Sequence, residues 1–293
     1  MVPFVPARRA VAAAAAAAAM ALAMVAATPA AVTARPATVP GLDPTPYYLA
    51  LGDSLAQGVQ PDSTGKSVET NQGYADDLWS RYHAAMPDLR LAKLGCPGET
   101  TATMATGGIC PYPLGSQLAQ ATAFLAAHRV VLVTLDIGAN NVDGCVHATG
   151  LDQACVAAGV ASAQHDLPLI LKALRQAGPS VAMVAMTYYD PFVAAALKGG
   201  AFPALAVQSE QIQAGFNQTL AAAYTAQGFT VADVAGAFAP LNLPSMPYLD
   251  LPVDLGIVCA YTWMCAPSPI GPNIHATPLG YLVIAQAFAQ KIG

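Results

Sequence analysis

The sequence predicts an α/β fold in three layers, with a central parallel sheet of five strands and helices on both faces. Five short apolar runs alternate with longer stretches of helical character, and this alternation is typical of a parallel sheet covered on both sides. The runs are continuously apolar, as in strands that are buried on both faces. The 293-residue chain is long enough for one sizeable core even without residues 1–34.

The predicted strands and helices follow one another in a regular order. The strands are residues 46–51, 90–94, 130–136, 180–187 and 229–234, and the helices are residues 73–86, 115–128, 151–177, 205–227 and 277–291. Residues 236–275 are rich in proline and have little periodicity, so we expect a long loop there. Loops of that length are usually functional or disordered.

The N-terminus has the layout of a secretory signal peptide. Arg8 and Arg9 precede a stretch that is almost all alanine, and small-residue sites follow near Ala31 and Ala34. We therefore predict a signal peptide over residues 1–34, a proline-rich linker over residues 35–45 and one domain over residues 46–293. A retained membrane anchor is the alternative for the first segment. No later segment has the ~20 apolar residues of a membrane span, so we expect a secreted protein with no stable membrane anchor.

The chain carries little charge, and that charge is acidic. Charged residues make up 10% of the sequence and the formal net charge is −5. The predicted signal peptide contains two arginines and no acid, so the remainder is more acidic still. This composition argues against a nucleic-acid partner and against anionic membrane surfaces. We expect a monomer.

The six cysteines form three couples that are close in sequence. An even count behind a signal peptide predicts disulfides. Because each cysteine is close in sequence to one other, we predict the pairs Cys96–Cys110, Cys145–Cys155 and Cys259–Cys265. A zinc site is the alternative, but no Cys-x-x-Cys or histidine spacing supports it, so we expect no metal.

Ser54 is the first candidate site residue. The sequence Gly52-Asp53-Ser54-Leu55 directly follows the first apolar run, which predicts a sharp turn at the end of a buried strand. α/β proteins bind ligands in the crevice above the carboxyl ends of their strands, where a serine hydroxyl can act as a nucleophile. Gly-Asp-Ser is also ordinary turn sequence, so this motif is weak by itself.

Three further blocks follow other predicted elements in a matching order. Gly98 lies just past the second strand, and a glycine can bring its backbone N–H close to a substrate. Asn140 follows the third strand, and its amide can donate to an oxyanion. His275 precedes the final helix and is the candidate base. His147, in a loop between two cysteines, is the one serious rival base.

With these four blocks the chain resembles an SGNH (GDSL) hydrolase, and more closely the secreted actinobacterial esterases and lipases with three disulfides. The resemblance covers roughly residues 46–291, and the run Trp263-Met264-Cys265 also resembles that branch. It implies a flavodoxin-like fold with Ser54 as nucleophile and His275 as base. It also implies an oxyanion hole formed by the backbone N–H groups of Ser54 and Gly98 and the side chain of Asn140.

Two positions depart from the family pattern. Asn141 stands where the third block usually has aspartate, which we expect to affect only local support. Pro272 stands where the last block usually has aspartate, three residues before the histidine. A backbone carbonyl can also accept the ring N–H of a histidine, so we expect the Pro272 carbonyl to orient His275. Asn273 is neutral and is expected to face another way, and the fallback acids are Asp250 and Asp254.

The resemblance implies a secreted serine hydrolase that acts on small-molecule or lipid carboxylic esters without metal or organic cofactor. Acyl transfer or polysaccharide deacetylation at the same site, and a binding module without catalysis, are the alternatives. The apolar residues of the long loop either line an acyl pocket or pack the loop on the core. These residues are Leu249, Leu251, Val253, Leu255, Ile257 and Val258.

Overall fold

Five parallel strands form the central sheet of the computed structural model, in the order β4-β1-β5-β8-β9. Their bounds are Asp43–Gly52 (β1), Arg90–Lys93 (β4), His128–Asp136 (β5), Ala182–Met186 (β8) and Thr230–Ala232 (β9). The structure describes residues 43–147, 150–200, 202–238 and 251–292, and leaves the side chains of residues 43 and 251–254 undescribed. The predicted sheet of five parallel strands is confirmed.

Strand β1 is the centre of the core. Tyr48, Leu49, Ala50 and Leu51 are fully buried because the strand pairs with β4 on one side and β5 on the other and is covered on both faces. The Tyr48 hydroxyl meets the Thr134 hydroxyl of β5 at 2.8 Å, so the polar end of this buried tyrosine is satisfied. Burial on both faces explains the continuously apolar sequence.

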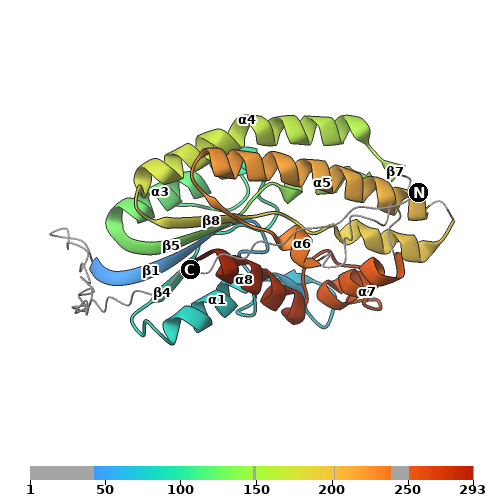
Figure 1. Cartoon of the computed structure of the whole chain (residues 1–293), viewed down its shortest axis with the longest axis horizontal. Coiled ribbons are helices and arrows are strands. Elements are labelled where there is room, and N and C mark those ends of the chain that lie inside the picture. Colours follow the sequence, from blue (N-terminus) through green and yellow to red (C-terminus); the bar gives the residue numbers. More distant parts are fainter. Residues whose placement is uncertain (1–42, 148–149, 201, 239–250, 293) are drawn as a thin grey trace, which may run out of the picture. The chain divides into compact units, whose positions relative to one another are not determined.

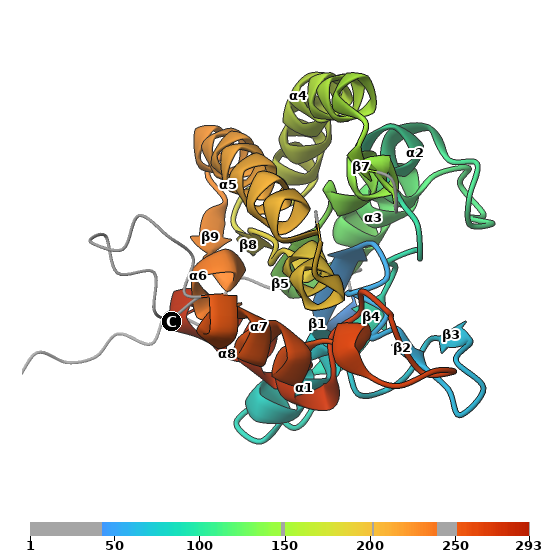
Figure 2. The ribbon, with the colours of Figure 1, turned by 90° about the vertical axis from the view of Figure 1, so that its right-hand side faces the viewer.

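Helices cover both faces of the sheet, which gives three layers (Figures 1 and 2). Helices α2, α3, α4 and α5 lie on one side, where α4 contacts each of the other three. Helices α1, α6, α7 and α8 lie on the other side, where α8 contacts each of the other three. The bounds of the first group are Thr101–Thr106, Gln117–Ala127, Gln153–Ala177 and Phe202–Ala226, and those of the second are Tyr74–His83, Val234–Phe238, Leu251–Tyr261 and Pro278–Ile292.

Helix α4 is the one described helix that is long and apolar enough, by length and composition, to cross a membrane. Asp152 caps its N-terminus, because its side chain accepts a hydrogen bond from the backbone N–H of Cys155. Its buried residues recur at helical spacing, as in a surface helix that faces a core. The buried residues are Val156, Gly159, Ala163, Leu167, Ile170, Leu171 and Leu174.

Helix α7 corrects the prediction of a long loop over residues 236–275. Leu251–Tyr261 is helical, although the segment is apolar on nearly every side and therefore has no helical periodicity to read. Pro252 lies in its first turn, where a proline is tolerated. Strand β1 also begins at Asp43, inside the segment predicted to be a linker. The predicted signal peptide lies outside the described residues.

The three predicted disulfides are all present. Cys96–Cys110, Cys145–Cys155 and Cys259–Cys265 have Cα–Cα distances of 6.1, 5.5 and 5.0 Å, and no cysteine is free. Along the chain, the first disulfide encloses Gly98, the second follows Asn140 and the third precedes His275.

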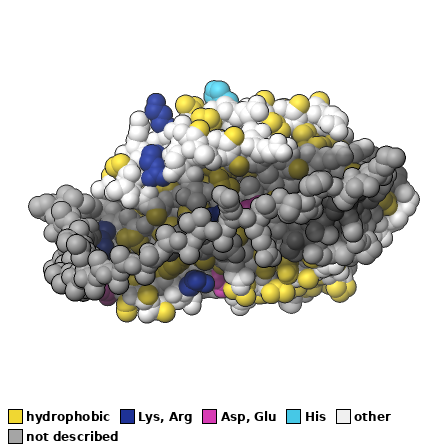
Figure 3. All heavy atoms as spheres, in the orientation of Figure 1, with side chains coloured by type: hydrophobic (Ala, Val, Ile, Leu, Met, Phe, Trp, Pro, Cys, Tyr) yellow, Lys and Arg dark blue, Asp and Glu magenta, His cyan; other side chains and the backbone are white. Residues whose placement is uncertain are grey.

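Few charged side chains are visible among the described residues in Figure 3. They lie among apolar and neutral side chains on this face. This distribution agrees with the low charge of the sequence.

Strand order places the candidate site. In chain order the sheet strands run 2-1-3-4-5, so the connections change direction between β1 and β5, where a crevice forms at the carboxyl ends. Gly52 at the end of β1 pairs with Asp136 at the end of β5. Ser54 and Asn140 therefore follow two adjacent strand ends.

Candidate active site

Ser54 lies on a tight turn that requires glycine at position 52. Gly52 has φ +132°, and a Cβ there would lie 1.9 Å from the Asp136 carbonyl oxygen, closer than any real contact. The side chain of Gln117 donates to the Gly52 carbonyl at 2.8 Å and accepts from its N–H at 2.7 Å. The chain is thereby fixed just before Ser54, which is 8% exposed.

A buried carboxyl group holds the turn from below. Asp136 Oδ2 accepts from the backbone N–H groups of Asp53 at 3.2 Å and Ala56 at 3.1 Å, and Tyr74 donates to Oδ1. Burial, and then the nearby Asp53 carboxyl, raise the pKa of Asp136 well above its ordinary value. The hydroxyl of Tyr188 donates to Asp53 at 2.9 Å. Both flanks of Ser54 are therefore fixed by side chains from other elements.

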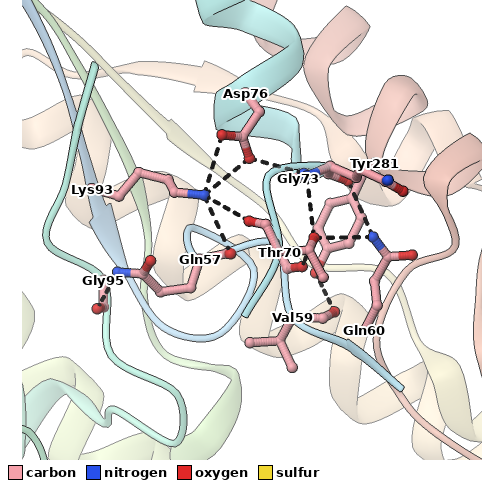
Figure 4. Close-up of polar contacts among 11 residues, drawn as sticks. Gln57, Val59, Gln60, Thr70, Gly73, Asp76, Lys93, Gly95 and Tyr281 are labelled. Atoms are coloured by element: carbon pink, nitrogen blue, oxygen red, sulfur yellow. Dashed lines mark hydrogen bonds and ion pairs between the residues drawn. The ribbon is translucent and has the colours of Figure 1, made fainter. Parts of the chain in front are cut away.

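An ion pair anchors the chain that runs from Ser54 to α1 (Figure 4). Lys93 Nζ, at the end of β4, lies 3.0 Å from Asp76 Oδ2 and 2.9 Å from the Thr70 carbonyl oxygen. Asp76 also accepts the Gly73 N–H at 3.0 Å. Both charged side chains are 16% exposed, so this contact is partly protected from solvent screening.

The two predicted oxyanion-hole blocks contact each other directly. Asn140 Nδ2 donates to the Glu99 carbonyl oxygen at 3.0 Å, next to Gly98, which has φ +84° and open space where a Cβ would lie. An amide nitrogen has two hydrogens, so one of them remains available to a ligand. Asn141 accepts the Thr101 backbone N–H at 3.0 Å. The asparagine at position 141, where the family usually has aspartate, therefore still supports this loop.

The partner of His275 differs from the predicted one. His275 Nδ1 lies 2.7 Å from Asn273 Oδ1, so the side chain of Asn273, and not the Pro272 carbonyl, occupies the position next to Nδ1. Asn273 Oδ1 also accepts the His275 backbone N–H at 3.0 Å. This is an Asx turn, in which an asparagine side chain bonds the backbone two residues further on. The expectation that Asn273 faces another way was wrong for that reason.

The backbone around His275 is held on both sides. Trp263 N–H donates to the His275 carbonyl at 3.0 Å, and Asn273 N–H donates to the Trp263 carbonyl at 3.2 Å. The Tyr189 hydroxyl donates to the Ile274 carbonyl at 2.8 Å. Burial lowers the pKa of His275 to about 4. The imidazole is consequently neutral at pH 7 and able to accept a proton.

Two cavities bring the predicted residues together. Ser54, Asn140 and His275 line a cavity of about 30 Å³, and the same three residues with Gly98 line a second one of about 320 Å³. The rival base His147 is exposed on the hairpin of β6 (Val146–His147) and β7 (Gly150–Leu151) and lines neither cavity. A larger cavity of about 1080 Å³ lies around Trp79, at the amino ends of β1 and β4, away from Ser54.

A match to a family model shows the family to which the chain belongs. The sequence profile of the GDSL-like lipase/acylhydrolase family matches residues 50–283. The chain belongs to this family. A comparison with curated proteins finds no significant match.

Solved structures share the family fold. The phospholipase A1 of Streptomyces albidoflavus NA297 is 19% identical over 84% of this chain and 98% of its own, with a TM-score of 0.52. The lipase Lip_vut3 from a goat rumen metagenome is 16% identical over 84% of this chain and 97% of its own, with a TM-score of 0.53. These likenesses confirm the predicted fold and leave the role of each residue to be tested.

The predicted apolar loop residues have separate outcomes. Val258 is buried against Val193 and Ala194, and Leu255 packs on the same cluster. Val258 also lines a cavity of about 140 Å³. This cavity shares Tyr188, Tyr189 and Gln213 with the cavity of about 30 Å³ that includes Ser54. Ile257 is half-buried. The other predicted lining residues and the fallback acids lie outside the described residues or side chains, namely Leu249, Leu251, Val253, Asp250 and Asp254.

Among the described residues, no group of His, Cys, Asp and Glu side chains is arranged to hold a metal ion. The expectation that the site needs no cofactor stays a prediction.

Asp190 lines the cavity of about 140 Å³, and we expect its replacement by asparagine to stabilise the protein at neutral pH. Burial raises the pKa of Asp190 to about 6. The carboxyl therefore stabilises the native state below its unfolded pKa of 3.8, and this contribution is lost as the pH rises through about 6. The resulting cost near pH 7 is at most about 3 kcal/mol.

Asparagine can keep both contacts of Asp190. The Phe192 N–H donates to Oδ1 at 2.8 Å and can do the same to an asparagine. The Ser209 hydroxyl now donates to Oδ2, but it can donate to the Ala206 carbonyl 2.9 Å away instead, so that its oxygen accepts from the asparagine Nδ2. Urea unfolding at pH 4 and pH 7.5 should show a gain for Asp190→Asn that grows with pH. Asp88→Asn, at an exposed position, should show no such growth. An equal effect of Asp190→Asn at both pH values would refute the account.

Proposed function

We propose that the protein is a secreted serine esterase or lipase that hydrolyses carboxylic esters, with Ser54 as nucleophile and His275 as general base. The observation that carries the proposal is that Ser54, Gly98, Asn140 and His275 line one cavity. These residues come from four separate segments, and together they supply a hydroxyl, a base and hydrogen-bond donors. Family membership supports ester chemistry.

The reaction proceeds in two steps. The Ser54 oxygen attacks the acyl carbon while His275 Nε2 takes the hydroxyl proton, and the departing alkoxide then receives that proton as the alcohol. Water next attacks the acyl-enzyme with the same base, releasing the acid and restoring Ser54. In each step the carbonyl oxygen becomes negatively charged and needs donors that are already in place.

Asn140→Ala tests the oxyanion hole, for which we propose the N–H groups of Ser54 and Gly98 and Nδ2 of Asn140. Loss of one donor at such a site lowers kcat by roughly a hundredfold to a thousandfold, and we expect that loss here with little change in KM. Steady-state kinetics and a thermal melt would be measured together. A variant that folds normally and keeps the kcat of the unmutated protein would exclude Asn140 from the oxyanion hole.

Secretion is supported by the three disulfides, which are typical of oxidising compartments, and by the N-terminal composition. We propose that the substrate is a small-molecule or lipid ester and that the protein needs no metal or organic cofactor. We also propose that the protein is a monomer, without a stable membrane anchor and without a nucleic-acid partner.

Hydrolysis of p-nitrophenyl acetate, butyrate and palmitate tests the proposed function. The cavities that include Ser54 and His275 measure about 30 and 320 Å³, so we expect kcat/KM to be higher for acetate and butyrate than for palmitate. Adding an alcohol to the same assay separates hydrolysis from acyl transfer. A folded, oxidised protein that hydrolyses none of the three esters would count against an esterase and favour a binding module.

A further inference from the structure

We propose that Asn273 takes the place of the missing acid, as a neutral positioning residue that fixes the tautomer of His275. This inference rests on the proposed function, in which His275 is the base. The usual acidic position is occupied by Pro272, which is exposed. The side chain of Asn273, one residue closer to the histidine, turns back to contact Nδ1 instead.

The hydrogen bonds determine which way the Asn273 amide points. The backbone N–H of His275 can only donate, and it lies 3.0 Å from Oδ1 of Asn273. At the other end of the amide, Nδ2 donates to the Ser67 hydroxyl at 3.0 Å. Ser67 belongs to strand β3 (Ser67–Val68), which pairs with β2 (Gln60–Pro61) in a hairpin. The amide oxygen therefore faces the histidine.

This orientation fixes the proton on the imidazole ring. An amide oxygen has no hydrogen to donate, so His275 Nδ1, at 2.7 Å, must carry one. Nε2 then holds a lone pair and can take the Ser54 proton. The proton passes from the Ser54 oxygen to Nε2 and on to the leaving alcohol, while the Nδ1–H to Asn273 bond stays intact. Asn273 neither gains nor loses a proton.

A neutral partner has a consequence that an acid would not have. The imidazolium that forms during the reaction is stabilised by an amide dipole rather than by a carboxylate charge.

Other titratable groups also surround His275. Among the described residues, the acids that line the two cavities with His275 are Asp53, Asp143 and Glu69, and the tyrosines are Tyr188 and Tyr189. Lys66 precedes Ser67 on the hairpin side. Asp53 accepts hydrogen bonds from Tyr188 and from the Leu55 N–H.

The pH dependence of kcat/KM is therefore the readout that separates positioning from mere support. Burial lowers the pKa of His275 to about 4, so the base remains available in mildly acidic solution. A carboxylate within hydrogen-bonding distance raises the pKa of a histidine by roughly one to three units. Asn273→Asp should therefore move the acidic limb of the profile upward by at least about one pH unit.

Two variants of Asn273 test the proposal on p-nitrophenyl acetate. We expect Asn273→Ala to lower kcat by roughly a hundredfold or more, since the ring can then adopt the wrong tautomer. Asn273→Asp should restore most of that loss at pH 8, because its carboxylate can accept both the Nδ1–H and the His275 N–H. Ser67→Ala removes only the outer contact of the amide and should cost much less than Asn273→Ala.

The outcomes separate this inference from the proposed function. If the unmutated protein is active and loses activity in Ser54→Ala, the proposed function stands whatever Asn273 does. In that case, a folded Asn273→Ala variant with unchanged kcat, or an Asn273→Asp variant with an unmoved acidic limb, would overturn the positioning role. Should Asn273→Ala fail to fold, the profile of Asn273→Asp alone decides the matter. Inactivity of the unmutated protein would instead remove the proposed function and this inference together.

Discussion

Replacing Ser54 with alanine is expected to lower kcat/KM for p-nitrophenyl acetate by roughly ten thousandfold or more. The hydroxyl is the only group lost, and the turn that carries it is held by other groups. Gly52, Asp53 and Ala56 keep their hydrogen bonds to Gln117 and Asp136 in the variant. The melting temperature should therefore remain close to that of the unmutated protein, and the loss can be assigned to chemistry.

Ser180→Ala provides the matched control for this experiment. Ser180 is exposed in the turn before β8 and lines neither of the two cavities that include Ser54. The control should keep full activity. If Ser54→Ala retained more than about a tenth of the activity, another group would have to be the nucleophile.

The second large effect is expected for His275→Ala, which removes the proposed base. An alcohol is a poor nucleophile until its proton is removed, so kcat should fall by roughly ten thousandfold. Residues that act as a unit are not additive. The double variant Ser54→Ala, His275→Ala should therefore be hardly slower than either single variant.

His147→Ala is the control for the histidine experiment, because His147 is exposed and lines neither cavity. It should leave kcat unchanged. A large loss in His147→Ala with normal folding, together with a small one in His275→Ala, would reverse the assignment of the base.

The sheet could be predicted because burial on both faces leaves a strong sequence signal. Each predicted strand overlaps an observed one, and the continuous apolar run of β1 corresponds to a strand with four fully buried residues in succession. Helix α7 could not be predicted in the same way. Its sequence is apolar around nearly its whole circumference, and only amphipathic helices have a period that can be read.

The site shows the same limit at the level of single residues. Ser54, Gly98, Asn140 and His275 could be identified because each follows or precedes a recognisable element. The contact between Asn273 and His275 was not predicted, because Asn273 is neutral and proximity in sequence does not tell which way a side chain points. An Asx turn over Asn273 and His275 was nonetheless a usable signal, since asparagine favours a hydrogen bond to the backbone two residues further on.

Contacts between distant segments were beyond sequence reasoning. Gln117 reaches Gly52 across 65 positions, and Tyr188 reaches Asp53 across 135. Asp136 is the last residue of the strand predicted over residues 130–136, but nothing in that sequence indicated that its side chain holds the Ser54 turn. Such contacts depend on the packing of the whole sheet and leave no local pattern.

The central claim is that Ser54 is a nucleophile activated by His275, and reaction with a fluorophosphonate probe tests it most directly. The intact protein and its proteolytic peptides would be weighed by mass spectrometry after labelling. We predict one adduct per chain, on Ser54, with labelling slowed strongly in His275→Ala and absent in Ser54→Ala. A folded protein that hydrolyses esters but carries its adduct on another residue, or carries none, would contradict the account.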